Sequence, residues 1–453
     1  MSTDGSRRWW ILGAMGAILG VILLDETVVG VALPTIQKDI GLSSLEAHWV
    51  VNIYLLVLAA LAGAAGRLGD IVGTRALVVG GLLLFGLASF AAGFAQSGTA
   101  LVVARAVQGV GAAAIFPLSL VLVSMSFDEA DRGMALGIYG AIGTSFLALG
   151  PVVGGLLTDY LSWRWIFWIN PPIVLVVACI TWILWRDPPH RDESGFDWAG
   201  LLLLVGGLGL TVFGIMEGPE RGWGRLDVLV PLILGIAMLI LLVVTELRVK
   251  APLIAMRLFS NGTFAASNMI VLLAQFVKIA TFVFGAMYFQ TVVGLSPLMS
   301  GVALLPAVVP PVLTAAFAGK AADLYGTRLP SLGGVLGTLI GLIFMAIGMQ
   351  AGVNLFVYAG LLLSGTAISF LFVPPQRAVM MSVPMGMQGQ AGGIVLSSQL
   401  LGGTFGMAIC STTYAMTGSF QSVFWVTAVF SAVILIYAYL ALAQTDPART
   451  ETA

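Results

Sequence analysis

Residues 66–75 read GRLGDIVGTR, and residues 319–328 read GKAADLYGTR. Both stretches follow the second apolar segment of a block of six such segments. Five residues recur with a constant offset of 253: Gly66, Asp70, Gly73, Thr74 and Arg75 reappear as Gly319, Asp323, Gly326, Thr327 and Arg328. The chain therefore contains two related halves in parallel orientation.

The composition requires lipid around most of the chain. Of the 453 residues, 59% are hydrophobic and 9% are charged, whereas a soluble domain carries about 25% charged residues. A spanning helix needs about 20 mainly apolar residues. We expect an all-α polytopic membrane protein with fourteen spanning helices near residues 9–33, 47–66, 76–95, 99–125, 133–157, 164–185, 198–217, 228–247, 263–290, 298–318, 329–349, 353–374, 389–412 and 420–443.

The repeat divides these helices into two six-helix bundles, residues 1–185 and 263–453. Residues 186–262 hold a polar linker and two inserted helices. If the N-terminus is cytoplasmic, fourteen of the twenty Lys and Arg residues lie inside, four outside and two within spans. This bias predicts that both termini are cytoplasmic. The first apolar run is interrupted by Asp25 and Glu26 and has no small-residue cleavage site, so we interpret it as a retained helix.

Several classes of function are disfavoured. The net charge of −1 argues against a nucleic-acid partner. Cys179 and Cys410 lie in apolar runs, which does not suit a disulfide framework. His48 and His190 belong to no Cys/His cluster, so we expect no metal site. The chain has no GxxxxGK[ST] phosphate loop and no recognisable catalytic set, which argues against a nucleotide-driven pump and an enzyme.

Four further motifs accompany the 66–75 loop. They are LDETVVGVALPTI at 24–36, RAVQGVGAA at 105–113, GPVVGG at 150–155 and WRWIFWINPP at 163–172. In this order they resemble the fourteen-helix drug:proton antiporter branch of the major facilitator superfamily, and the resemblance covers nearly the whole chain. It implies a protein of the bacterial plasma membrane in which two six-helix bundles rock around a central cavity, powered by the proton gradient.

Charged residues inside the membrane are candidates for the proton site, because each costs about 2.5–3.5 kcal/mol on insertion scales. Asp25 and Glu26 are about 100° apart around helix 1, so at most one points straight into a cavity. Burial favours the neutral form of either carboxylate, which suits a proton carrier. The resemblance matches Asp25 to the family motif and implies that Arg105 helps govern the proton site. The plainer alternatives are a structural hydrogen bond for a carboxylate and a packing ion pair for Arg105.

Lys278 departs from the family pattern. Subtracting the repeat offset from 278 gives position 25, which makes Lys278 in helix 9 the counterpart of Asp25. Parallel repeats place such positions at equal depth on opposite walls of a cavity. We hypothesise that Lys278 pairs with Asp25 or Glu26 in one state and disfavours purely cationic cargo. The alternative is that Lys278 snorkels or forms a fixed salt bridge.

Two groups of residues could control conformational change. The glycines of GPVVGG allow close helix packing, and the proline between them can kink helix 5. The two repeat loops suit a latch on the cytoplasmic side, in which their arginines can pair with Asp128, Glu129 or Asp131. Glycine packing without gating and positive-inside topology signalling are the plainer alternatives. The candidate gating residues are Gly66, Asp70, Gly73, Arg75, Asp128, Arg132, Gly150, Pro151, Gly154, Gly155, Gly319, Asp323, Gly326 and Arg328.

An apolar cavity with a few polar groups would suit amphiphilic ligands. Candidate lining residues are Asn52, Tyr54, Phe116, Tyr139, Phe146, Gln275, Phe282, Tyr288, Gln290, Phe372 and Gln399. We predict a monomeric, lipid-embedded exporter of amphiphilic drugs or metabolites, with the proton as coupling ion and no cofactor. One alternative is a dedicated exporter of an anionic or zwitterionic lipid-like molecule, siderophore or antibiotic, which Lys278 favours. Another is a transport-inactive scaffold or sensor, against which the retained intramembrane charges argue.

Overall fold

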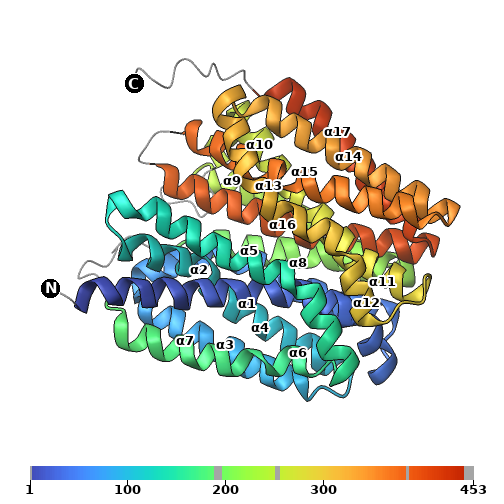
Figure 1. Cartoon of the computed structure of the whole chain (residues 1–453), viewed down its shortest axis with the longest axis horizontal. Helices are drawn as coiled ribbons and strands as arrows, with labels where there is room; N and C mark the ends of the chain where they lie inside the picture. The colour runs from blue at the N-terminus through green and yellow to red at the C-terminus, as the bar shows by residue number, and fades with distance from the viewer. Residues whose placement is uncertain (1–2, 188–195, 250–255, 384–386, 443–453) are drawn as a thin grey trace. The chain divides into compact units, whose positions relative to one another are not determined.

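The computed structural model describes residues 3–187, 196–249, 256–383 and 387–442. Within these ranges, fourteen helical segments are long and apolar enough to cross a membrane, which confirms the predicted all-α class and helix number. Figure 1 shows the helices with their labels. Their bounds are α1 Thr3–Ile40, α2 Ser44–Val72, α3 Thr74–Gly93, α4 Gly98–Ser126, α5 Glu129–Tyr160, α6 Trp165–Trp168, α7 Asn170–Leu184, α8 Trp198–Arg221, α9 Leu226–Glu246, the 3₁₀ helix η1 Met256–Ser260, α10 Gly262–Ile279, the π-helix η2 Ala280–Phe284, α11 Gly285–Thr291, α12 Pro297–Ala303, α13 Leu305–Tyr325, α14 Arg328–Ala351, α15 Asn354–Met381, α16 Gln388–Thr417 and α17 Phe420–Ala441.

One predicted span was placed too early. The sequence predicts a continuous helix over 298–318, whereas the structure has a short α12 and a longer α13 that begins at Leu305. Pro306 lies in the first turn of α13, where a residue without a backbone N–H is tolerated because that donor has no helical partner. The spanning segment therefore runs from Leu305 to Tyr325.

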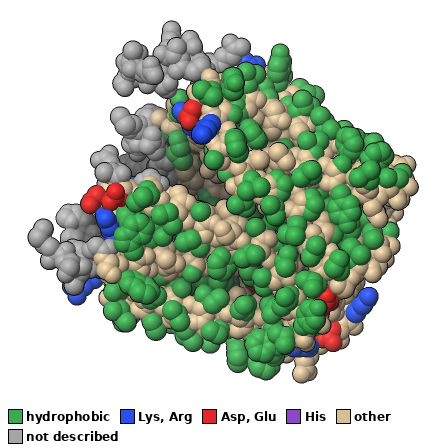
Figure 2. Space-filling model, viewed as in Figure 1, with side chains coloured by type: hydrophobic (Ala, Val, Ile, Leu, Met, Phe, Trp, Pro, Cys, Tyr) green, Lys and Arg blue, Asp and Glu red, His purple; other side chains and the backbone are tan. Residues whose placement is uncertain are grey.

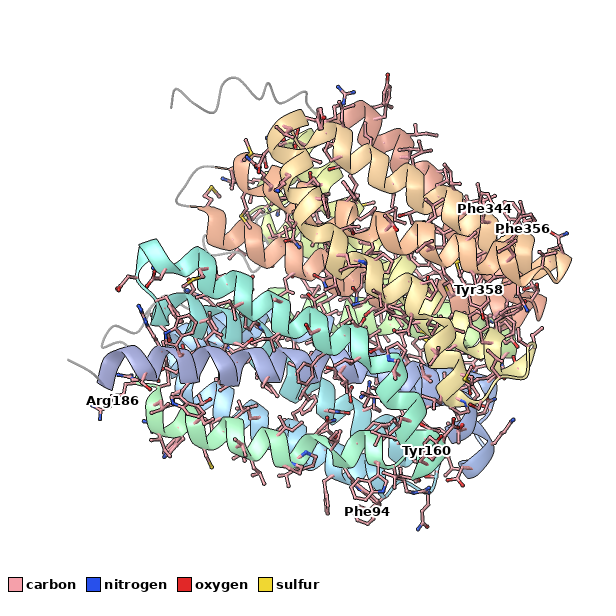
Figure 3. All side chains as sticks on the ribbon, viewed as in Figure 1. Phe94, Tyr160, Arg186, Phe344, Phe356 and Tyr358 are labelled. Carbon is pink, nitrogen blue, oxygen red and sulfur yellow. The ribbon has the colours of Figure 1, made fainter. Side chains whose placement is uncertain are left out.

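The surface of the helices suits a hydrocarbon solvent. Large apolar side chains such as Leu87, Leu313 and Phe317 are more than half exposed. Figure 2 shows hydrophobic side chains over much of the face in view, with charged side chains near its margins. Figure 3 shows Phe94 and Tyr160 at one end of the helices that carry them, and Arg186 at the opposite end of this group of helices. Exposed apolar surface on this scale is typical of contact with lipid or with a partner.

Contacts divide the chain into two compact units. Unit 1 comprises the chain up to Leu208 together with Phe289–Val302, and unit 2 comprises Gly209–Tyr288 together with the chain from Ala303 onward. These units differ from the predicted sequence domains, because α8 is shared between them and because Phe289–Val302 packs with unit 1.

In unit 1, α1 lies against α5 along its length and also contacts α4 and α7 (Figure 1). Glycines make the α1–α5 contact close. A Cβ atom at Gly16 would lie 2.7 Å from Ile142, and one at Gly20 would lie 2.6 Å from Phe146. This packing holds the middle of α1, which carries the acidic pair, inside the bundle.

In unit 2, α10 is the buried helix and packs against α15, α16 and α17. A Cβ atom at Gly406 of α16 would lie 2.8 Å from Phe276 of α10, so these helices are also in close contact. Thr412 Oγ1 on α16 donates a hydrogen bond to Ile215 O on α8 at 2.7 Å, which ties the inserted helix α8 to this unit.

The internal repeat is visible in the helix ends. Adding the offset of 253 to the first and last residues of α2, Ser44 and Val72, gives the first residue of α12 and the last residue of α13. Gly73 and Gly326 have φ angles of 108° and 71°, which residues with a Cβ atom rarely adopt. The second copy differs in being interrupted: η2 separates α10 from α11, and α12 is separate from α13, whereas α1 and α2 are continuous.

Candidate functional site

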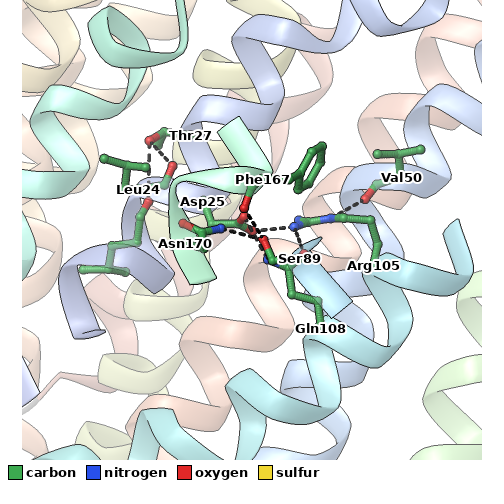
Figure 4. Close-up of polar contacts among 10 residues, drawn as sticks. Leu24, Asp25, Thr27, Val50, Ser89, Arg105, Gln108, Phe167 and Asn170 are labelled. Carbon is green, nitrogen blue, oxygen red and sulfur yellow. Dashed lines mark hydrogen bonds and ion pairs between the residues drawn. The ribbon is translucent and has the colours of Figure 1, made fainter. Parts of the chain in front are cut away.

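Asp25 and Arg105 form an ion pair in the interior of unit 1. Their relative exposures are 2% and 1%, and Arg105 Nη1 donates to Asp25 Oδ2. Arg105 Nε donates to Val50 O on α2 at 3.1 Å, and the Tyr54 ring lies 4.2 Å from the guanidinium carbon. Arg105 on α4 thereby joins α1 to α2 through one buried charge (Figure 4).

Gln108, one turn after Arg105 on α4, binds both members of the pair. Its Oε1 accepts from Arg105 Nη1 at 2.8 Å, and its Nε2 donates to Asp25 Oδ1 at 3.1 Å. Residues three apart on a helix share a face, which explains how both side chains reach Asp25. A Cβ atom at the next residue, Gly109, would lie 2.9 Å from Tyr54 O, so a glycine at this position lets α4 approach α2 closely.

Two residues that the sequence analysis missed complete the network. Ser89 on α3 is buried, and its Oγ donates to Phe167 O at 2.8 Å. The same Oγ accepts from Asn170 Nδ2 at 2.9 Å and from Gln108 Nε2 at 3.4 Å. Asn170 lies within the WRWIFWINPP motif and could have been singled out there. Ser89 lies in an ordinary apolar run and carries no comparable signal.

This arrangement can bind a proton at the cost of an ion pair. A buried charge whose partner is removed is strongly destabilising. If Asp25 takes up a proton, Arg105 loses its counter-ion and must find another partner. Proton binding at Asp25 is therefore linked to the position of a side chain that contacts α1, α2 and α4.

The other two intramembrane charges are also buried. Glu26 follows Asp25 on α1, and Lys278 lies on α10 of unit 2. The pairing of Lys278 with Asp25 or Glu26 stays a prediction.

The GPVVGG segment packs against α1 just beyond the acidic pair. A Cβ atom at Gly150 would overlap the Thr27 hydroxyl, and one at Gly154 would lie 3.1 Å from the Cα of Val28. Thr27 and Val28 follow Asp25 by two and three residues. A movement of α1 at Asp25 would therefore change the packing between α1 and α5 directly.

An adjacent face of α5 contacts the start of α12. A Cβ atom at Gly155 would lie 2.5 Å from the Cα of Leu298. One turn later, Asp159 Oδ2 accepts hydrogen bonds from Ser296 Oγ at 2.9 Å and from Leu298 N at 3.0 Å. A carboxylate at a helix N-terminus satisfies free N–H groups there and is favoured by the helix dipole. Gly155 and Asp159 thus hold the first turn of α12 on α5.

We predict that Gly155→Ala weakens this contact, because the added methyl group meets the backbone of Leu298 rather than a flexible side chain. Overpacking of this kind typically costs about 1–3 kcal/mol. Thermal unfolding in detergent should show the loss. The control is Gly140→Ala on the same helix, where a Cβ atom meets nothing within 4 Å; an equal effect of the two substitutions would contradict the prediction.

The repeat arginines Arg75 and Arg328 each contact the last helix of their own half. Arg75 Nη2 donates to Trp182 O, and its guanidinium carbon lies 4.0 Å from the centre of the Trp182 ring. Arg328 Nη2 donates to Tyr439 O at 2.8 Å, and the corresponding ring distance is 5.4 Å. Both aromatic residues lie two positions before the end of their helix. Carbonyl groups at a helix C-terminus lack helical partners and attract cations.

The structure gives these arginines partners other than the acids after helix 4, and their pairing with those acids stays a prediction. Arg8 lies beside two of the acids: its Nη1 is 3.0 Å from Asp131 Oδ2 and 4.0 Å from Asp128 Oδ2. The side chain of Glu129 lies outside the described residues.

Of the two repeat aspartates, Asp323 on α13 forms an ion pair with Arg377 on α15. The side chain of Asp70 lies outside the described residues. Arg132 Nε donates to Ser124 O at 3.0 Å, across the connection between α4 and α5. The gating role of these residues stays a prediction.

Several predicted lining residues already have structural partners. Tyr139 Oη lies 2.7 Å from Ser119 Oγ, and Gln290 Nε2 donates to Val31 O at 2.7 Å. Tyr54 contacts Arg105, Phe146 packs on Gly20, and Tyr288 lies edge to face with Phe420. A lining role stays a prediction for these residues and for Asn52, Phe116, Gln275, Phe282, Phe372 and Gln399.

Comparison with solved structures establishes the fold. A bacterial homolog of the human lysosomal transporter Spinster aligns with a TM-score of 0.70 at 15% identity, covering 97% of each chain. A D-xylose-proton symporter aligns with a TM-score of 0.70 at 15% identity, covering 97% of this chain and 99% of that one. The chain therefore has the fold of these polytopic transporters.

The chain belongs to the Major Facilitator Superfamily, whose family model matches residues 15–311 and 267–453. It is 34% identical to the puromycin resistance protein pur8 of Streptomyces alboniger, over 90% of this chain and 82% of that one. It is 32% identical to the multidrug resistance protein Stp of Mycobacterium tuberculosis, over 89% and 75%. The tetracenomycin C resistance and export protein of Streptomyces glaucescens is 31% identical, over 90% and 76%.

Proposed function

We propose that this protein is a proton-coupled antiporter that exports amphiphilic drugs or metabolites across the bacterial plasma membrane by alternating access, with both termini in the cytoplasm. The observation that carries the proposal is the buried Asp25–Arg105 pair, which is bridged by Gln108 inside a bundle of a transporter family. A proton-driven cycle requires a titratable group inside the membrane, and the carboxyl group of this buried pair supports that role.

In the proposed cycle, Asp25 binds a proton and releases Arg105, which then moves away from α1. The loss of this ion pair acts on α1 next to its contacts with Gly150 and Gly154 of α5. Through these contacts a change of charge at Asp25 becomes a change in helix packing. Loss of the proton restores the pair and resets the packing.

The relatives support export of drug-like cargo. Their names refer to resistance to puromycin, to many drugs, to methyl viologen or to tetracenomycin C. We therefore expect this chain to accept amphiphilic molecules with aromatic groups.

A dedicated exporter of one antibiotic is the second candidate. One relative is named for resistance to and export of a single compound. The buried Lys278 also favours a cargo that is not purely cationic. The breadth of the accepted cargo separates the two candidates.

The proposal predicts that an imposed cargo gradient moves protons in the opposite direction. The purified protein is reconstituted in liposomes that contain a pH-sensitive dye, and gradients of puromycin, methyl viologen and tetracenomycin C are applied in turn. Proton movement with several cargos indicates a broad exporter, and movement with one alone indicates a dedicated one. Protein-free liposomes are the control. Cargo that binds, as shown by a thermal shift, without any proton movement would overturn the proposal.

A further inference from the structure

We propose that Ser89 and Asn170 are positioning residues that keep Nε2 of Gln108 directed at Asp25 and thereby prevent the amide from stabilising the protonated carboxyl group. The inference rests on the proposed function, because it assigns parts to the same proton site. It follows from counting the donors and acceptors around Gln108.

The hydroxyl group of Ser89 has one hydrogen, and it donates this hydrogen to Phe167 O at 2.8 Å. The carbonyl oxygen can only accept, so the direction of this hydrogen bond is fixed. Towards Asn170 and Gln108 the Ser89 oxygen can therefore only accept, at 2.9 Å and 3.4 Å. Asn170 Nδ2 holds Ser89 in this role from α7.

The amide of Gln108 is fixed from two sides. Arg105 has no acceptor, so the Gln108 atom that faces it must be Oε1. Ser89 can only accept here, so the Gln108 atom that faces it must be Nε2. With both constraints, Nε2 donates to Asp25 Oδ1.

A proton that arrives at Asp25 therefore meets two unlike oxygens. Oδ1 accepts a hydrogen bond from the Gln108 amide, and in this orientation the amide offers no acceptor to a protonated carboxyl group. Oδ2 accepts from Arg105, and protonation of the carboxyl group removes the negative charge that holds the guanidinium group. Proton uptake therefore weakens the contact with Arg105, and the fixed amide does not compensate by stabilising the protonated form.

Ser89 matters most once Arg105 has moved. The amide then has one anchor left, and Ser89 keeps Nε2 directed at Oδ1. Without the hydroxyl group, Gln108 could turn over and accept a hydrogen bond from the protonated carboxyl group. That extra bond would stabilise the protonated form and shift its loss to higher pH. Among the described residues, Glu26 on α1, Tyr54 on α2 and Arg105 on α4 are charged or titratable groups of the same cluster, and Ser89→Ala changes none of them.

The test is an infrared titration of the carboxyl group in the purified protein, with Asp25→Asn as the reference that identifies its band. Ser89→Ala should raise the pH at which Asp25 is half-protonated by about half to one unit, the equivalent of one ordinary hydrogen bond. Asn170→Leu should shift it in the same direction by less, because Ser89 is then held only by Phe167 and Gln108. Ser89→Thr keeps the hydroxyl group and should restore the original value.

Ser364→Ala is the matched control, because Ser364 is a buried serine that bonds only carbonyl groups of its own helix. It should leave the titration unchanged. If Ser89→Ala lowers thermal stability but leaves the half-protonation pH of Asp25 where it was, Ser89 is merely structural and the inference fails while the proposed function stands. If Asp25 shows no titration in the unmodified protein, the proposed function itself fails.

Discussion

Replacing Asp25 by asparagine is expected to reduce uphill export, driven by a pH gradient across proteoliposomes, to the level of protein-free liposomes. The amide has nearly the same shape as the carboxyl group, and it can still accept the hydrogen bond from Gln108. It has no proton to exchange, so Arg105 has no counter-ion to gain or lose during the cycle. Exchange of labelled for unlabelled cargo, which needs no net proton transfer, should persist.

Asp227→Asn is the matched control, because Asp227 is an exposed aspartate whose arginine partners Arg221 and Arg225 are also exposed. A surface pair contributes about 0–1 kcal/mol, so transport should be unaffected. Glu26→Gln, measured separately, shows whether the neighbouring carboxyl group shares the task. If the Asp25→Asn variant still exports cargo uphill, Asp25 does not carry the transported proton.

Replacing Arg105 by methionine is expected to lower the free energy of unfolding by about 3–5 kcal/mol, because a buried carboxylate then loses its partner. The substitution keeps most of the length of the side chain while removing the hydrogen bonds to Asp25, Gln108 and Val50. Denaturant or thermal unfolding in detergent gives the measurement. The double variant Asp25→Leu/Arg105→Met should recover most of the loss, since apolar replacement of a buried pair is often neutral, yet it should not transport.

Arg164→Met provides the comparison. Arg164 also pairs with an aspartate, Asp39, at 2.7 Å, but its side chain is 28% exposed and that of Asp39 is 45% exposed. The expected cost is about 1 kcal/mol or less. If Arg105→Met and Arg164→Met lower the free energy of unfolding equally, burial does not increase the contribution of the Asp25–Arg105 pair to stability.

The sequence was sufficient to find the charged centre of the site. Asp25 and Arg105 interrupt apolar runs, where a charge is costly enough to be conspicuous, and the structure brings them together. Ser89 could not be found in this way, because a serine in an apolar helix is common and its importance arises only from what α4 and α7 place beside it.

The interpretation of the repeat loops shows a different difficulty. The duplication itself could be read from the identical residues of the two loops, and both repeated glycines, Gly73 and Gly326, have positive φ angles. The partners of Arg75 and Arg328 could not be predicted from the sequence, because they are backbone carbonyl groups and every residue has one. Only the end of a helix makes such an oxygen available, and the sequence does not show which helix end lies beside each arginine.

The π-helical turn Ala280–Phe284 changes the rotational phase between the two copies. A π-type bulge holds one residue more than the α-helical turn it replaces, and each residue corresponds to about 100° of rotation. The starts of α2 and α12 match in the repeat. Counted back from these starts, each residue of α10 before the bulge has a sequence counterpart in α1. By helix face, however, it corresponds to the residue that follows this counterpart. By face, Lys278 thus corresponds to Glu26, and Asp25 corresponds to its uncharged neighbour Val277.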